Sequence, residues 1–147
     1  LTAGYTDAGA VGVPPLRGEA TIVLHSRRKK AALYDVNHGM QYVEQVEGEK
    51  GIIGHFENGD AIIFRELNLS GIKNVLVRAG GLSKSGSFEL RKGSPKGSLL
   101  ASIKVKETGD REFEELPAQL KAGGLTDVCV VAKTKGVLGL NWIEFQK

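Results

Sequence analysis

Cysteine is nearly absent from this sequence, and long hydrophobic runs are absent altogether. Cys129 is the only cysteine among 147 residues, which excludes an internal disulfide and a zinc site built on cysteines. It stands in the apolar run Val128–Ala132, which predicts a buried, unreactive thiol. No run of about 18 apolar residues occurs, so the sequence predicts no insertion into a membrane.

The sequence also lacks the motifs of catalysis. It contains no nucleophile elbow, no zinc-protease helix and no helix-loop-helix calcium loop. The glycines of Gly81–Gly86 have phosphate-loop spacing, but Ser87 and Phe88 follow them, which favours a plain turn. His25, His38 and His55 are widely and irregularly spaced. We therefore predict a protein without enzymatic activity, cofactor or bound metal.

Glycine, in contrast, is abundant and evenly distributed. The 20 glycines separate short apolar runs, a spacing typical of many short strands joined by turns. Residues 1–18 are rich in glycine and alanine and lack alternation, which predicts an extended arm or linker before a domain at 19–147. Because the chain begins at Leu1 without a leader sequence, we expect a piece of a larger protein.

The apolar pattern predicts an all-β fold. Asn58 and Gly59 favour a tight hairpin between strands at 51–56 and 61–66. The segment 110–121 is ambiguous, because its apolar spacing is helical while Pro117 disfavours a helix; we expect a strand to Leu116 and then a loop. With these, nine to ten short strands predict a two-sheet antiparallel β-sandwich, or jelly roll. The remaining strands are expected at 20–25, 31–34, 74–79, 87–91, 99–105, 126–132 and 138–145.

Charge is unevenly distributed although the net charge is only +3. Between Arg78 and Lys106 lie seven bases and one acid, Glu89. Such a stretch fits either a polyanion-binding face or ordinary solvated strands. The segment lacks the interleaved aromatics on which nucleic-acid bases stack, which argues against a nucleic-acid partner.

Several segments resemble, in the right order, the family 6 carbohydrate-binding modules. Lys29–Asp35 and Gly39–Gln41 resemble the family's opening strand and its Gly-Val-Gln step. Ile53–Ala61 is similar to its Val-Gly-Tyr-Ile-Asp-Asn-Gly-Asp-Trp segment. Leu90–Leu100 resembles the Ser-Pro-x-Gly-x-Leu hairpin, and Leu140–Phe145 the closing strand. The resemblance implies a jelly roll that binds sugar near its loops, without catalysis and as part of an exported bacterial protein.

The positions of the family's sugar site have changed. The two aromatics that grip a sugar ring fall on His55 and near Arg111, and the hydrogen-bonding asparagine falls on Gly139. Stacking on aromatic faces supplies much of the apolar contact in a sugar site. We therefore expect a remodelled cleft in which His55, Arg111 and Glu57 bind an acidic or unusual glycan, since arginine can hold a carboxylate by two hydrogen bonds.

Other family positions bear on the same question. The calcium-binding carboxylates fall on Lys30, Ala32 and Asn141, which predicts no calcium there. The resemblance implies that Trp142 is a core residue, whereas Tyr42 is the aromatic most available to a ligand.

Two functions remain open on the sequence alone. The first is a secreted, periplasmic or cell-surface module that binds a polysaccharide for its parent enzyme. The second is a structural module that has lost sugar binding and only packs against the parent enzyme's other domains; such a module should expose a contiguous apolar patch.

Overall fold

The computed structural model describes residues 2–12, 14–21, 26–43, 53–109 and 112–147. These residues form strands and one short 3-10 helix, η1 (Ala31–Leu33). None of the described helices is long and apolar enough to cross a membrane. The strands are β1 (Thr2–Thr6), β2 (Arg17–Thr21), β3 (Arg28–Lys30), β4 (Val36–His38), β5 (Gln41–Val43), β6 (Ile53–Phe56), β7 (Ala61–Asn68), β8 (Asn74–Gly81), β9 (Gly86–Lys92), β10 (Leu99–Val105), β11 (Glu114–Gln119), β12 (Leu125–Thr134) and β13 (Leu138–Gln146).

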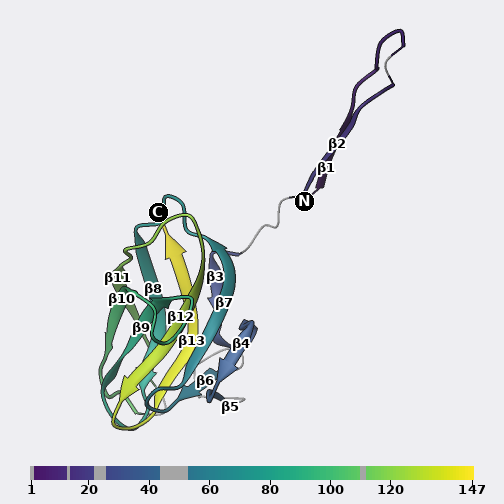
Figure 1. The fold of residues 1–147 in the computed structure, drawn as a ribbon. Coiled ribbons are helices and arrows are strands. Elements are labelled where there is room, and N and C mark those ends of the chain that lie inside the picture. Colours follow the sequence, from purple (N-terminus) through teal and green to yellow (C-terminus); the bar gives the residue numbers. More distant parts are fainter. Residues whose placement is uncertain (1, 13, 22–25, 44–52, 110–111) are drawn as a thin grey trace.

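Two antiparallel sheets face each other and form a sandwich (Figure 1). One sheet has the order β10-β9-β12-β7-β4, and the other has the order β11-β8-β13-β6-β5, with β3 added along β13. This arrangement confirms the predicted all-β antiparallel sandwich. The described residues contain more strands than the nine to ten predicted, because β1, β3, β4 and β5 lie where no strand was expected.

The core lies between the sheets and follows from the alternation of the longer strands. In β9, Phe88 and Leu90 point inward, and their neighbours Ser87 and Glu89 do not. Phe88 meets Phe56 of the opposite sheet edge-to-face, with ring centroids 5.2 Å apart. This contact joins the two layers close to the end of the sandwich where β6 ends.

The turn at Asn58–Gly59 exists, but the predicted hairpin is wrong. β6 belongs to the six-stranded sheet and β7 to the five-stranded sheet, so the turn carries the chain from one layer to the other. The physical reason is that φ is positive only at Gly59, at 92°. A type I′ hairpin turn needs positive φ at both central residues.

Two further segments differ from the prediction. Residues 31–33, expected as a strand, form η1 instead, and β11 continues through Pro117 to Gln119 rather than ending in a loop. Proline is tolerated there because β11 is the last strand of its sheet and pairs only with β8.

The N-terminal segment is a hairpin rather than a featureless arm. β1 and β2 pair antiparallel from Thr2 opposite Thr21 to Thr6 opposite Arg17, so β2 runs across the expected boundary at residue 18. The hairpin stands apart from the sandwich (Figure 1). The strand expected at 20–25 is described only to Thr21, and residues 22–25, with His25, lie outside the described residues.

Candidate functional site

A row of residues crosses the outer face of the six-stranded sheet near one end. Gln41 of β5 pairs with His55 of β6, His55 with Gly139 of β13, and Gly139 with Gly80 of β8. The next residue pairs along these strands, such as Phe56 opposite Leu138, point into the core. Because strand residues alternate between faces, this row faces outward.

The turn from Glu57 to Asp60 lies beside this row and is firmly held. The Glu57 amide donates to Oδ2 of Asp60 at 2.8 Å, and the Asp60 amide donates to the Glu57 carbonyl at 3.1 Å. Oδ1 of Asp60 packs against Gly39, where a side chain would collide with it. The Gly59 amide donates to the Ala132 carbonyl at 2.9 Å. These contacts fix the backbone that presents the Glu57 side chain.

Two hollows meet at this turn, and together we name them the loop-end cleft. The smaller hollow, of about 120 Å³, is lined by Gly39, Gln41, His55, Glu57, Asp60 and Val137. The larger one, of about 360 Å³, is lined by Glu57, Asn58, Thr134, Lys135, Gly136 and Val137. Glu57 and Val137 line both. Since small-molecule sites usually enclose about 300–1,000 Å³, a ligand of sugar size requires the larger hollow.

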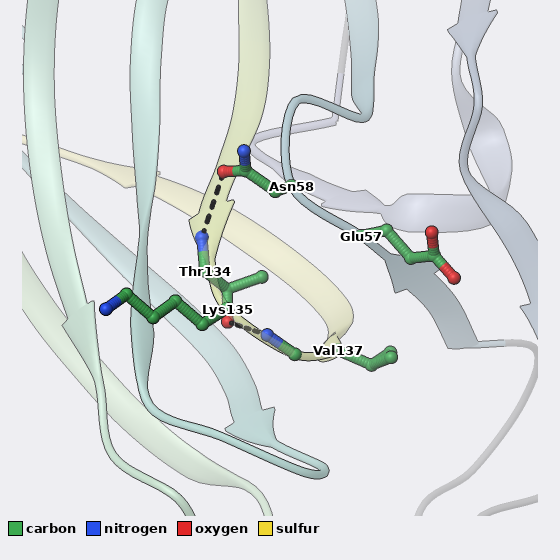
Figure 2. A pocket seen from close by; sticks show the side chains of 6 residues that line it. Glu57, Asn58, Thr134, Lys135 and Val137 are labelled. Carbon is green, nitrogen blue, oxygen red and sulfur yellow. Dashed lines mark hydrogen bonds between the residues drawn. The ribbon is translucent and has the colours of Figure 1, made fainter.

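Figure 2 shows how the larger hollow is arranged. Asn58 accepts a hydrogen bond from the Thr134 amide at 3.3 Å, and the Thr134 hydroxyl oxygen accepts one from the Gly136 amide at 3.1 Å. The first bond holds the turn after β12 against the turn after β6, and the second lies within the turn after β12. The side chains of Glu57 and Lys135 lie on opposite sides of the turn after β12 (Figure 2). A carboxylate and an ammonium therefore flank that turn without contacting each other.

Sequence reasoning missed Phe113 as part of this region. Its ring packs on Gly139 and Gly80, with Cδ1 3.1 Å from where a Cβ of residue 80 would lie. Phe113 is only 6% exposed and touches Leu82 outside the main core. An aromatic ring therefore covers the glycine end of the row. No sequence signal could reveal this contact, because Gly80 and Gly139 become neighbours only through the pairing of β8 with β13.

The structure brings together some of the predicted site residues. His55 and Glu57 line the same hollow, as the segment 53–61 led us to expect. Tyr42 does not join them, because it pairs with Gly54 and points to the opposite face of β5 from Gln41. Arg111 lies outside the described residues, although Glu112 and Thr108, on either side of it, both lie against Gly80.

Tyr42 instead stacks on Tyr34, with ring centroids 6.0 Å apart. A side-chain hydrogen bond with Tyr34 is the main cause that raises the pKa of Tyr42 to about 12. Tyr42 is still 46% exposed, so it remains open to a ligand, but to one on a different surface from the loop-end cleft.

Trp142 lies on the outer face of the six-stranded sheet rather than between the sheets. It pairs with Arg78 and Lys30, while the next residue, Ile143, points into the core. The Arg28 guanidinium lies 4.0 Å from the centre of the indole ring and also pairs with Glu144, with Nη2 2.6 Å from Oε2. Trp142 is thus buried, as the resemblance implied, but beneath an arginine.

Glu144 completes this outer-face cluster. Its Oε1 accepts a hydrogen bond from Gln146 Nε2 at 3.2 Å, and its Oε2 accepts one from Arg28 Nε at 2.7 Å. These two bonds, that of Gln146 first, lower the pKa of Glu144. The cluster ties β3 to β13 on the face away from the core.

The three positions expected to disfavour calcium lie on β3, η1 and β13. Lys30 is exposed on β3, Ala32 is in η1 and Asn141 is buried in β13. Among the residues that the structure describes, no group of three or more histidines, cysteines, aspartates or glutamates could hold a metal ion. Cys129 is fully buried, and desolvation is the main cause that raises its pKa to about 11.

Comparison with known proteins places this architecture. The model of the family "Carbohydrate binding module (family 6)" matches residues 30–147. Over 118 residues the chain is 26% identical to endo-1,4-beta-xylanase A of Thermoclostridium stercorarium; the match covers 78% of this chain but 22% of that protein. The match thus spans only about a fifth of the length of that xylanase.

Solved structures give the same result. A family 6 module from Clostridium cellulolyticum in complex with xylose has a TM-score of 0.75 and 25% identity, covering 84% of this chain and all of that one (100%). A family 6 module from Clostridium stercorarium in complex with cellobiose has a TM-score of 0.72 and 25% identity, covering 82% of this chain and 92% of that one.

Proposed function

This chain belongs to family 6 of the carbohydrate-binding modules, and we propose that it is a non-catalytic module that attaches a larger exported protein to a glycan carrying acidic sugars. The observation that carries the proposal is the loop-end cleft, whose two hollows share Glu57 and Val137. Its described lining offers hydrogen-bonding side chains and no phenylalanine, tyrosine or tryptophan. Polar contacts rather than stacking therefore supply the binding energy here.

Basic side chains at the margins of the cleft favour a carboxylate-bearing sugar. Lys135 lines the larger hollow. Arg111 lies outside the described residues and enters this proposal on the family resemblance of its sequence position alone. A guanidinium binds a carboxylate by two parallel hydrogen bonds, which a neutral sugar cannot match. Glu57 accepts hydroxyl protons from the same sugar.

The carboxylates of the cleft support binding rather than hydrolysis. Glycosidases need two carboxyl groups on opposite sides of the bond that is cleaved. Here Glu57 and Asp60 come from one turn, and Oδ2 of Asp60 already accepts the Glu57 amide at 2.8 Å. Only Glu57 is left to face a sugar from that turn.

Isothermal titration calorimetry tests this proposal with three kinds of short oligosaccharide: xylo-oligosaccharides, cello-oligosaccharides and oligosaccharides of uronic acids. We expect the uronic-acid oligosaccharides to bind most tightly, and Arg111→Ala and Lys135→Gln each to weaken them about tenfold, the loss typical of one charge-assisted hydrogen bond. Glu115→Gln is the control, because Glu115 is exposed on β11 and lines neither hollow. If none of these glycans binds the unmodified protein, the proposed function is wrong.

One observation favours the second function, a packing module that has lost sugar binding. The ring of Phe113 occupies the space above Gly139 and Gly80, at the end of the row where the family's asparagine would lie. In that case Phe113→Ala changes stability but creates no affinity for any glycan. The isolated sandwich then binds other domains of its parent protein, which calorimetry with those domains detects.

A further inference from the structure

A third hollow opens at the edge of the sandwich and adjoins the turn after β12, where the Thr134 hydroxyl donates to the Ser85 carbonyl at 3.1 Å. β10 and β11 are the terminal strands of the two sheets, and they lie side by side. Between them and the start of β9 opens a groove of about 550 Å³, which we name the edge groove. Its volume falls well within the range of small-molecule sites.

The edge groove carries two ammonium groups that the sandwich itself does not neutralise. Lys104 and Lys106 line the groove and are exposed, and no ion pair engages either of them among the described residues. The neighbouring Glu107 is directed to Lys84, with Oε2 3.7 Å from Nζ. Glu114 supplies the only carboxylate of the lining.

The rest of the lining suits the body of a sugar. Leu116 and the buried Val105 contribute an apolar surface, and Ser87 and Ser102 contribute hydroxyl groups beside it. The apolar face of a pyranose ring packs on aliphatic carbon, and hydroxyls exchange hydrogen bonds with the sugar's own hydroxyls. The same groove thus combines an apolar floor, hydroxyls and uncompensated positive charge.

We propose that the edge groove is a second binding site, which takes a segment of a polysaccharide bearing carboxylate or sulfate groups. The apolar floor and serines contact the ring, and Lys104 and Lys106 pair with the anionic substituents. Two of the seven bases between Arg78 and Lys106, namely Lys104 and Lys106, line this groove. The two sites share no lining residue, although Ser85 of the groove accepts a hydrogen bond from Thr134 of the cleft, so variants in each site are needed to tell them apart.

A polysaccharide fits this groove better than a nucleic acid does. Proteins that bind single strands combine positive charge with aromatic rings on which bases stack. The lining of the edge groove contains no aromatic residue. Lysines on a narrow aliphatic floor can pair with anions on a sugar chain but offer a base no platform.

The test is calorimetry of the intact chain with three probes of similar length: oligogalacturonate, a sulfated dextran oligosaccharide and neutral dextran. We expect binding of at least one anionic probe and none of the neutral one. Lys104→Gln/Lys106→Gln should weaken that binding at least about tenfold, the loss expected for charge-assisted contacts. The control Lys92→Gln/Lys96→Gln removes the same charge from exposed residues outside the groove and should change affinity less than about twofold.

A second pair of variants tests whether the anionic probe binds in the edge groove itself. Glu114→Gln keeps an acceptor oxygen but removes a like charge, so it should tighten binding of the anionic probe. Glu115→Gln removes the same charge from the next residue, which lies on the other face of β11 opposite Arg78, and should have little effect. Comparison of the two anionic probes tells whether carboxylate or sulfate is preferred.

Several results would overturn the proposal. One is equal weakening by the two lysine pairs, which indicates diffuse charge attraction rather than a site. Another is binding of single-stranded DNA of the same charge as tightly as the sugar probes. A third is weakening of anionic binding in Lys135→Gln with no weakening in Lys104→Gln/Lys106→Gln; the anionic glycan then belongs to the loop-end cleft, and the proposed function survives while the edge groove fails.

Discussion

Replacing Gly139 with alanine should destabilise the sandwich, and removing Phe113 at the same time should recover part of that loss. A Cβ at position 139 would lie inside van der Waals contact with Cζ of Phe113 and 3.1 and 3.2 Å from its Cε2 and Cε1. The backbone of Gly139 is not in the left-handed region, so alanine meets no backbone strain there. Steric overlap with the Phe113 ring is therefore the only cause of the expected loss of stability.

The magnitudes follow from this packing. Overpacking by one methyl group at a tight contact costs about 1–3 kcal/mol of unfolding free energy. Phe113→Ala costs about 2–3 kcal/mol, below the usual range for a core phenylalanine, because the ring lies outside the main core. In the double variant the new methyl enters the space that the ring left, so the two losses should fall short of their sum by about 1–2 kcal/mol.

Urea denaturation of the four proteins measures this coupling directly. Gly123→Ala is the control, because nothing lies within 4 Å of a Cβ at that position and its φ is not positive. That variant should be neutral or stabilising by up to about 1 kcal/mol. Additive losses in the Gly139→Ala/Phe113→Ala double variant would show that the ring does not cover Gly139, and the description of the row would be wrong.

Three further predictions concern groups with displaced pKa values. Cys129, fully buried with a pKa of about 11, should react with a chromogenic thiol reagent at pH 8 only after denaturant is added; fast reaction of the native protein would contradict its burial. Because hydrogen bonds lower the pKa of Glu144, its contribution to stability is present above the ordinary value of 4.5 and is lost as pH falls through the lower folded value. Arg28→Ala should therefore flatten the fall of the urea midpoint below pH 4.5, and an unchanged slope would count against the pairing. In Tyr34→Phe, ultraviolet titration should find the pKa of Tyr42 moved from about 12 toward 10, and no movement would mean that Tyr34 is not the cause.

The fold was predictable where one strand face is apolar and the other polar. Three strands, β9, β10 and β12, lie close to their expected bounds. Their alternating or continuous apolar residues favour a strand over a helix. The turn at Asn58–Gly59 was located correctly, but its residues do not say which sheet the next strand joins. Sheet membership depends on distant pairing, here of β6 with β13 and of β7 with β12.

The candidate site was only partly predictable for a similar reason. His55 and Glu57 lie two residues apart on one strand and its turn, so their presence in one hollow follows from local sequence. Tyr42 lies on a different surface from them, and the sequence could not show this, because a strand of three residues gives too little alternation to fix which side faces the cleft. The contact of Phe113 with Gly139 joins residues that only the pairing of β8 with β13 makes neighbours.

The central claim is that the loop-end cleft binds a glycan carrying acidic sugars, and backbone amide shifts in a ¹⁵N-labelled sample test it most directly. On titration with a uronic-acid oligosaccharide, the account predicts saturable shifts grouped at Gln41, His55, Glu57 and the Thr134–Val137 turn, which line the two hollows. In Lys135→Gln these shifts should need about tenfold more oligosaccharide to saturate. An absence of shifts at these amides, with the oligosaccharide in large excess, would contradict the account and leave the packing module as the function.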